Sequence, residues 1–291
     1  MKIKDILRRK KPVLSFEFFP PKTTMSTLSI GETIGELKYL QPDYVSVTYG
    51  AGGSSQDMSF TLNDHINNRT GLTTMAHYTC VGASRDKVKS DLLRLKELNI
   101  ENLMLLRGDP PSGQGDFEPA VDGFAYAAEL VAFSRKLGNF CIGVAGYPEK
   151  HIQAPDMKTD LKYLKEKVDA GADFIVTQMF FKNEYYFRFL EQVRDIGIKC
   201  PVIPGIMPIT NYKNIAKFAK MTNTSIPPEI IKQFEGIENN PAKMLEVGTN
   251  IAYEQCSELL DAVECPGIHF YTLNKSSATL DIFKKLNFIR R

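Results

Sequence analysis

Tryptophan is absent from this sequence of 291 residues, and histidine and cysteine are scarce, at four and five residues. The histidines (His65, His77, His151 and His269) show no short metal-ligand spacing such as H-E-x-x-H. The cysteines (Cys80, Cys141, Cys200, Cys256 and Cys265) are odd in number and include no C-x-x-C pair, which is a poor basis for a disulfide framework. We therefore expect reduced thiols and predict no metal site.

An excess of one charge and a long apolar run are also lacking. Lys and Arg number 36 against 34 Asp and Glu, so the formal net charge of +2 gives no long-range attraction for nucleic acid or anionic lipid. No signal-peptide core of ~7–15 apolar residues follows the basic start MKIKDILRRKK, and no segment reaches the ~18–20 apolar residues of a membrane span. These absences favour a cytoplasmic enzyme or binding protein. The basic run at 8–11 is interpreted as the solvated end of a first short helix.

Strand and helix patterns alternate regularly along the chain. Eight apolar, β-branched or aromatic runs are bounded by Gly or Pro and predict strands: VLSFEFFP, YVSVTYG, TTMAHYTC, NLMLLRG, FCIGVAGYP, FIVTQMFF, VIPGIMP and GIHFYTLN. Helical periodicity occurs at 25–40, 57–69, 84–98, 123–138, 156–170, 182–197, 211–222 and 276–287. This alternation predicts an α/β protein, a single (β/α)8 TIM barrel domain over residues 1–291. The additional segments PPEIIKQFEGI and PAKMLEVGTNIAYEQCSELLDAV predict extra helices inserted before strand 8.

Polar side chains mark the ends of most of the predicted strands. Catalytic groups of such barrels lie at the C-terminal ends of the strands, because all of these ends open on one mouth. The residues that the pattern delivers there are Glu17, Thr48, Tyr49, His77, Thr79, Arg107, Gly108, Asp109, Tyr147, Gln178, Tyr271 and Asn274.

Glu17 is the least expected of these residues, because it lies between two phenylalanines of a strand. The period of two in LSFEFFP places Ser15, Glu17 and Phe19 on one face, which we assign to the barrel lumen. Burial disfavours the charged form of a carboxyl group, so we expect a raised pKa that suits a general acid near neutral pH. The alternative is a structural carboxylate paired with Arg or Lys, since a buried charge needs a proton or a partner.

Seven strand-end motifs occur in order along the chain: SFEFFPPK, VSVTYGAGG, MAHYTC, LRGDPP, AGYPEKH, DLKYLKEKVDAGADFIVTQMFF and PGIMPI, with HFYTLN after them. Together they resemble the successive motifs of the flavin-dependent 5,10-methylenetetrahydrofolate reductases over residues 13–275. The resemblance implies FAD at the C-terminal mouth of the barrel and a role in one-carbon metabolism and methionine biosynthesis. It also implies alternation: NADH or NADPH reduces the flavin and leaves, and methylenetetrahydrofolate then takes its place and is reduced to 5-methyltetrahydrofolate.

The resemblance assigns three catalytic residues. Glu17 matches the acid that protonates the folate nitrogen whose departure opens the five-membered ring. Asp109 matches a carboxylate beside the flavin ring and the pterin, where its charge opposes the anionic reduced flavin. Gln178 matches an amide that contacts either substrate in turn. Without the resemblance, Asp109 is also explained as a strand-end turn residue, and Gln178 as part of a satisfied polar network in the core.

The resemblance also implies a cofactor set and a substrate set. The positions that match FAD contacts are Thr48, His77, Thr79, Arg107, Gly108, Asp109, Tyr147, His151, Asp160, Lys167 and Ala172. The positions that match substrate contacts are Glu17, Asp109, Gln178, Phe218, Tyr271 and Lys275. Phe218 is equally typical of the core of an amphipathic helix. Tyr163 departs from the smaller polar residue expected near the ribityl-phosphate region, which leaves one FAD contact open.

Two other functions are compatible with these residues. A flavin barrel could take electrons from a partner protein or a ferredoxin, although no cysteine cluster supports an internal iron–sulfur relay. Alternatively, the barrel could be a folate-binding subunit of a methyl-transfer complex, but such a subunit would have no use for a ring-opening acid. The pattern does not distinguish NADH from NADPH, and a homo-oligomer is expected by analogy alone.

Two segments exclude further features of related proteins. GAGGSS breaks the G-x-G-x-x-G pattern at Ser55, so neither dinucleotide is expected on a Rossmann domain and the glycines are interpreted as loop hinges. The sequence ends at LNFIRR, without the regulatory domain of longer eukaryotic relatives, so we expect no inhibition by S-adenosylmethionine.

Overall fold

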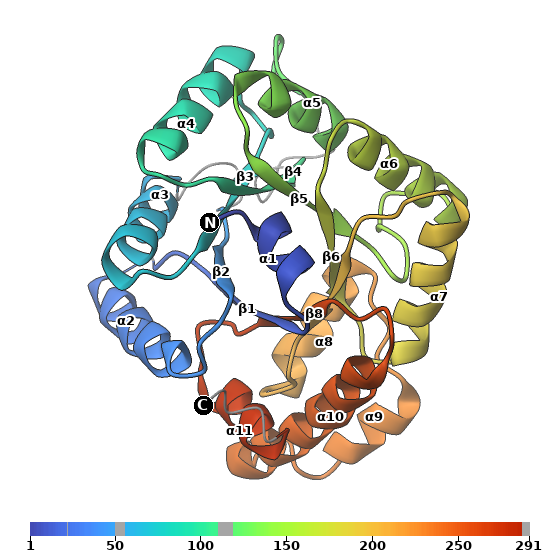
Figure 1. Cartoon of the computed structure of the whole chain (residues 1–291). Coiled ribbons are helices and arrows are strands. Elements are labelled where there is room, and N and C mark those ends of the chain that lie inside the picture. Colours follow the sequence, from blue (N-terminus) through green and yellow to red (C-terminus); the bar gives the residue numbers. More distant parts are fainter. Residues whose placement is uncertain (22, 50–55, 110–118, 287–291) are drawn as a thin grey trace.

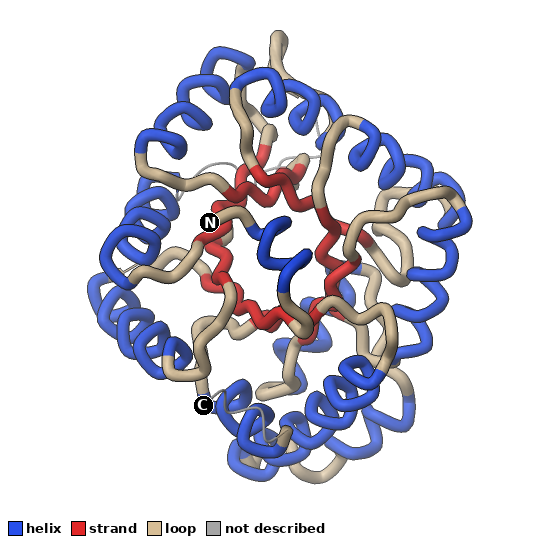
Figure 2. Tube along the Cα trace, in the orientation of Figure 1, coloured by secondary structure: helices blue, strands red, loops and turns tan. Residues whose placement is uncertain are grey.

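Eight parallel strands pair in sequence order and close into a barrel, because β1 pairs with both β2 and β8. The computed structural model describes residues 1–286 except for 22, 50–55 and 110–118, so the GAGGSS segment lies outside the described residues. The strands are β1 (Val13–Phe18), β2 (Tyr44–Val47), β3 (Thr74–Thr79), β4 (Asn102–Leu106), β5 (Cys141–Gly146), β6 (Phe174–Met179), β7 (Val202–Ile206) and β8 (Gly267–Tyr271). Figure 2 shows them as a closed ring viewed down its axis. The predicted (β/α)8 barrel is confirmed.

A helix follows each strand of the ring (Figure 1). The helices are α2 (Thr24–Lys38), α3 (Gln56–His65), α4 (Arg85–Glu97), α5 (Ala127–Leu137), α6 (Met157–Asp169), α7 (Asn183–Asp195), α8 (Tyr212–Thr222), α9 (Pro228–Phe234), α10 (Pro241–Asp261) and α11 (Ser277–Lys285). A π-helical turn, Ile66–Thr70, extends α3. Because α9 and α10 lie between β7 and β8, the extra helices predicted before strand 8 are also confirmed.

The main hydrophobic core lies between the ring and its helices. Strand residues such as Phe16 and Tyr78 are buried there against helix residues such as Leu92 and Ile282. Alternate residues of each strand point outward into this layer, which leaves the other half facing the lumen. The apolar surface buried in this layer is the main driving force of the fold.

The short helix α1 (Ile3–Arg9) closes the N-terminal end of the barrel. Its residues Ile3, Ile6 and Leu7 are buried against lumen side chains of seven strands. The N–H group of Ile3 donates to Asn102 Oδ1, at the start of β4, over 2.8 Å. Figures 1 and 2 show α1 in the middle of the ring. Since this end is filled, the lumen is open only toward the C-terminal ends of the strands.

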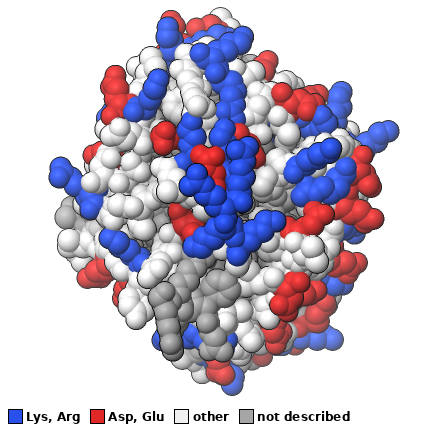
Figure 3. Space-filling model, in the orientation of Figure 1, with Lys and Arg blue, Asp and Glu red and all other residues white. Residues whose placement is uncertain are grey.

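The basic run at the end of α1 is exposed on the N-terminal face. Lys and Arg side chains gather in the middle of this face (Figure 3), and Arg8, Arg9, Lys10 and Lys11 are all exposed. Lys10 Nζ lies 2.6 Å from Asp43 Oδ1. The run is therefore the solvated end of a first short helix, as the sequence indicates. Within the described ranges, the helices lack the combination of length and apolar character that spanning a membrane requires.

Candidate active site

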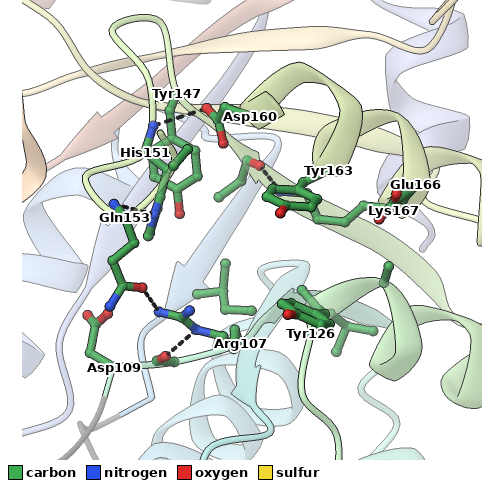
Figure 4. A pocket seen from close by; sticks show the side chains of 17 residues that line it. Arg107, Asp109, Tyr126, Tyr147, His151, Gln153, Asp160, Tyr163, Glu166 and Lys167 are labelled. Carbon is green, nitrogen blue, oxygen red and sulfur yellow. Dashed lines mark hydrogen bonds between the residues drawn. The ribbon is translucent and has the colours of Figure 1, made fainter. Parts of the chain in front are cut away.

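Two adjoining cavities open at the C-terminal mouth. The outer cavity has a volume of about 360 Å3 and is lined by residues at the ends of β4 and β5 and by α6 (Figure 4). The central cavity has a volume of about 370 Å3 and reaches down to Glu17. Leu106, Asp109, Ala145 and Tyr147 line both cavities, so the two lie side by side.

Most of the predicted site residues line this space. Those of the central cavity are Glu17, Thr48, His77, Asp109, Tyr147, Gln178, Phe218 and Tyr271. Those of the outer cavity are Arg107, Gly108, Asp109, Tyr147, His151, Asp160 and Lys167. Phe218 is 36% exposed on α8, which favours the site interpretation of this residue over the core interpretation.

Three residues of the predicted FAD and substrate sets do not line either cavity. Thr79 is buried in β3, and its Oγ1 has no hydrogen-bond partner among the described residues. Ala172 is buried in the core between α6 and β6. Lys275 is exposed in the loop between β8 and α11. The structure therefore brings together most of the strand-end residues, but Thr79 and Asn274 line neither cavity and Lys275 lies at the surface.

Glu17 lies at the bottom of the central cavity between two histidines from other strands. The residue is only 7% exposed. Glu17 Oε2 lies 3.3 Å from His77 Nε2 and 3.5 Å from His269 Nε2. The Ser46 hydroxyl donates to the same oxygen over 3.4 Å. The alternative partners considered from the sequence, Arg and Lys, are replaced here by two imidazoles.

The pKa of Glu17 is lower than its ordinary value, so the expectation of a raised pKa is wrong for this arrangement. Burial does raise the pKa, and it is the largest single cause. The hydrogen bond with His269, the charges of His77 and His269, and the hydrogen bond from Ser46 together outweigh it. Burial also lowers the pKa of His77, and the charge of Glu17 offsets part of this effect.

His269 is the site residue that the sequence reasoning missed. Its Nδ1 lies 2.8 Å from Ser15 Oγ, so Ser15, His269 and Glu17 form one polar chain inside the lumen. The strand pairing explains the contact, because Ser15 is the partner of His269, and Glu17 is the partner of Tyr271. One signal was present in the sequence: His269 and Tyr271 are two residues apart in a strand, and so they share the inward face.

The lumen face of β6 brings Gln178 to the cavity, because Val176 and Phe174, two and four residues earlier, also face the lumen. The pairing of β6 with β7 shifts between Val176 and Met179, beside Gln178. The extra residue leaves the ladder, as in a β-bulge. The N–H group of Gly205 donates to Thr177 Oγ1 over 2.9 Å, so the side chain of Thr177 replaces a missing backbone partner. Gln178 lines the central cavity, and its Oε1 accepts a hydrogen bond from Met179 N–H over 2.9 Å.

Gly205 makes room for Tyr271. The Tyr271 hydroxyl donates to Thr177 O over 2.6 Å, across the lumen side of β7. A Cβ atom on Gly205 would lie 2.4 Å from Thr177 O and 2.6 Å from the Tyr271 ring. Because those distances are shorter than any van der Waals contact, only glycine permits this hydrogen bond.

Gly108 shapes the boundary of the two cavities. Its φ of +86° is in the left-handed region, and a Cβ atom would lie 2.7 Å from Val81 Cγ1 and 2.8 Å from Thr79 Cβ. Beside it, an Arg107 terminal nitrogen donates to Gln153 Oε1 over 2.5 Å (Figure 4). The backbone of Gly108 and the guanidinium group of Arg107 therefore form one wall of the outer cavity.

A cation and a carboxylate of α6, Lys167 and Asp160, line another wall of the outer cavity. Lys167 Nζ donates to Ala145 O over 2.6 Å, and burial lowers the pKa of Lys167 to about 8. The N–H group of His151 donates to Asp160 Oδ2 over 3.0 Å. Burial raises the pKa of Asp160 and lowers that of His151. Asp160 and Lys167 lie on one face of α6, two turns apart, as the sequence predicts.

Two tyrosines flank the entrance of the outer cavity. The rings of Tyr126 and Tyr163 are stacked with centroids 6.2 Å apart and planes inclined by 18° (Figure 4). They are 59% and 43% exposed. Tyr126 directly precedes α5 and was not singled out from the sequence, because its segment carries no strand-end pattern. Tyr163 thus lines the cavity in place of the smaller polar residue that the resemblance implies.

The fold and the paired cavities define a class: (β/α)8 barrels whose ionisable groups gather at the C-terminal mouth. Residues 2–287 match the family model described as methylenetetrahydrofolate reductase. The chain is 39% identical to methylenetetrahydrofolate reductase (NADH) 1 of Arabidopsis thaliana, over 99% of this chain and 50% of that protein. It is also 39% identical to the 5,10-methylenetetrahydrofolate reductase of Salmonella typhimurium, over 92% of this chain and 88% of that protein. The chain therefore belongs to the methylenetetrahydrofolate reductase family. It spans about half the length of the plant relatives.

Solved structures share the barrel. An uncharacterized protein from Clostridium thermocellum, described as binding two copies of 5-methyl-5,6,7,8-tetrahydrofolic acid, superimposes with a TM-score of 0.68 and 16% identity over 100% of both chains. Phosphoenolpyruvate phosphomutase from Streptomyces platensis gives a TM-score of 0.51 and 11% identity over 97% of this chain and 86% of the other. At these identities the likeness shows the fold alone.

Proposed function

We propose that this chain binds FAD at the barrel mouth and uses NADH or NADPH to reduce 5,10-methylenetetrahydrofolate to 5-methyltetrahydrofolate. The observation that carries the proposal is the position of Glu17. A carboxyl group with two imidazoles lies at the bottom of a cavity that Asp109 and Gln178 also line. Family membership and the names of the relatives support the same reaction, and the plant relatives' names favour NADH.

The outer cavity has the groups that a flavin dinucleotide needs. Lys167 offers a partly buried cation for a diphosphate, and Arg107 offers a second one. The left-handed Gly108 lets a planar ring approach the backbone closely, because a Cβ atom has no room there. When bound, FAD supplies the two-electron chemistry that couples oxidation of the pyridine nucleotide to reduction of the folate.

Glu17 supplies the proton for ring opening. When the carbon–nitrogen bond of the folate's five-membered ring breaks, the leaving nitrogen needs a proton, and Glu17 is the acid that lines the central cavity. A folate ring in the cavity excludes water from Glu17, which strengthens the effect of burial and raises its pKa toward the working range. After the product leaves, Glu17 takes up a new proton from solvent that enters the open central cavity.

Asp109 and Gln178 orient the substrate. Asp109 lines both cavities, so its carboxylate lies where the flavin and the pterin meet. Gln178 has a donor and an acceptor in one amide, and it faces the same space from β6. Together they can hold either a nicotinamide or a pterin in one place, which suits two substrates that bind in turn. The single domain, the homo-oligomer and the cytoplasmic location stay predictions.

The test is the visible absorption spectrum of the purified protein under anaerobic conditions. We expect a flavin band that bleaches with NADH and returns with methylenetetrahydrofolate. Bleaching by dithionite but not by NADH or NADPH would favour electrons from a partner protein. A colourless protein that takes up no added FAD would contradict the proposal and favour a folate-binding subunit.

A further inference from the structure

Asn274 joins the ends of β1 and β8 above Glu17. Its Oδ1 accepts a hydrogen bond from Phe19 N–H over 2.8 Å, and its Nδ2 donates to Phe19 O over 2.9 Å. A residue of an antiparallel pair exchanges these same two bonds with the residue directly opposite, so the Asn274 amide acts as a backbone partner for Phe19. The last residues that the two strands pair directly are Glu17 and Tyr271. The Asn274 side chain therefore extends the β1–β8 pairing past the end of both strands.

The loop that carries Asn274 has an uncommon backbone. Leu273 and Asn274 both lie in the left-handed region, with φ of 50° and 57°. Asn tolerates this conformation, but Leu rarely adopts it. The Thr272 hydroxyl holds the loop, because it donates to Glu17 O over 2.6 Å and accepts from Asn274 N–H over 3.2 Å. Strain of this kind persists where the surroundings fix it, and it gathers at ligand sites.

The consequence falls on two apolar side chains of the central cavity. Phe19 and Leu273 both line it, and Phe19 is 39% exposed. Pro20 follows Phe19 and has no N–H group, so the strand cannot continue its pairing there. Asn274 binds both backbone polar groups of Phe19, and so it fixes the direction of that side chain.

We propose that Asn274 is a positioning residue for the folate. It holds Phe19 and Leu273 as an apolar pair against which a planar ring of the substrate packs. It also fixes the end of the strand that carries Glu17. This role rests on the proposed function, and it assigns to Asn274 no contact with the reacting atoms.

Four variants test the role. Asn274→Gly keeps the left-handed backbone and removes the amide, while Asn274→Asp keeps the acceptor for Phe19 N–H and repels Phe19 O. Phe19→Ala removes the side chain that the amide positions. Asn99→Gly is the matched control, because Asn99 has a φ of 60° in the α4–β4 connection, at the opposite end of the barrel. Each variant is compared with the wild type in flavin content, in flavin reduction by NADH, and in kcat and KM for methylenetetrahydrofolate.

We expect Asn274→Gly to raise the KM for the folate by roughly tenfold, as the loss of two hydrogen bonds at one residue suggests, while flavin content stays unchanged. Asn274→Asp should have a smaller effect. In a Phe19→Ala background, Asn274→Gly should add less than about twofold, because residues that act through one another are not additive. Effects that multiply, or a loss of thermal stability with an unchanged KM, would overturn the role. A wild type that binds flavin but does not reduce the folate would refute the proposed function as well, whereas an active wild type with unaffected variants would refute the positioning role alone.

Discussion

Replacing Lys167 with Met should stabilise the ligand-free protein and weaken FAD binding at the same time. Burial lowers the pKa of Lys167 from its usual 10.5 to about 8, and Asp160 offsets only part of this effect. At 1.36 kcal/mol per pH unit, that difference corresponds to about 3 kcal/mol of unfavourable free energy for the charged form at neutral pH. Met has a similar length and carries no charge. After the loss of the hydrogen bond to Ala145 O, at about 1 kcal/mol, we expect a gain of roughly 1–2 kcal/mol in the free energy of unfolding.

The pH dependence has a definite sign. Between about pH 8 and 10.5 the unfolded chain keeps the proton of Lys167 while the folded protein has lost it. The unfolded state therefore binds more protons at this position, so Lys167 contributes a rise in stability with pH in this window, while the buried cysteines, whose thiol pKa values burial raises, contribute in the opposite direction. Lys167→Met should lack this rise, since nothing titrates at that position.

FAD binding should respond in the opposite direction. A diphosphate beside Lys167 favours its charged form, so binding above about pH 8 requires uptake of a proton and weakens as the pH rises toward 10. A hydrogen bond between charged groups contributes about 1.5–3 kcal/mol, so Lys167→Met should raise the dissociation constant of FAD by roughly 10- to 100-fold. The variant's affinity should no longer fall over this pH range.

The assay combines thermal denaturation of the ligand-free protein with flavin-fluorescence titrations at pH 7, 8 and 9. We expect the midpoint of Lys167→Met to rise by roughly 2–6 °C. Lys162→Met is the control, because Lys162 is exposed on the same helix and does not line the cavity. A Lys167→Met protein that melts at a lower temperature and binds FAD as tightly as the wild type would refute the reasoning.

Three further changes test other parts of the site. Glu17→Gln should lower the rate of folate reduction by about 100-fold or more, while flavin reduction by NADH continues. Stopped-flow absorbance measures both rates, and a normal rate of folate reduction would show that Glu17 is not the acid. Tyr163→Asn should weaken FAD binding by less than about tenfold, because it removes one ring of the stack with Tyr126. Equilibrium titration measures the FAD affinity, and an unchanged affinity would mean that the stack does not reach the cofactor. Gly205→Ala should lower the free energy of unfolding by roughly 1–3 kcal/mol and raise the KM for the folate, because the new methyl group displaces Tyr271. An unchanged denaturation midpoint would contradict the close packing around Gly205.

The barrel and its helix boundaries were predictable because their signals are local. Period-two alternation and the Gly or Pro at each run's end mark the strands without any knowledge of their neighbours. The helices differ from their predicted ranges by a few residues, and the differences have local causes. The helix predicted at 57–69 ends its α-helical part at His65 and continues as a π-helical turn. The helix predicted at 123–138 begins at Ala127, because Tyr126 has an extended backbone.

The cavity linings were only partly predictable, because they depend on contacts between distant segments. Tyr126 lies in a loop without strand-end motifs, yet its ring stacks on Tyr163, 37 positions further along the chain (163 − 126). Lys275 matched a substrate position in the sequence, but the left-handed turn at Leu273 and Asn274 leaves it exposed. Neither the stack nor the turn has a signature in composition or periodicity.

The proton affinity of Glu17 could not be predicted, because two opposing effects both depend on burial. Burial removes water from the carboxylate and raises its pKa, and this much follows from a carboxylate among phenylalanines. The same burial strengthens the interaction with His77 and His269, which lowers the pKa, and these residues are 60 and 252 positions away (77 − 17; 269 − 17). Which effect is larger depends on how β3 and β8 are placed around β1, and the 3.3 Å and 3.5 Å contacts with Glu17 Oε2 exist only in the closed barrel. The sequence pattern therefore locates the acid, while the pairing of distant strands sets when it holds its proton.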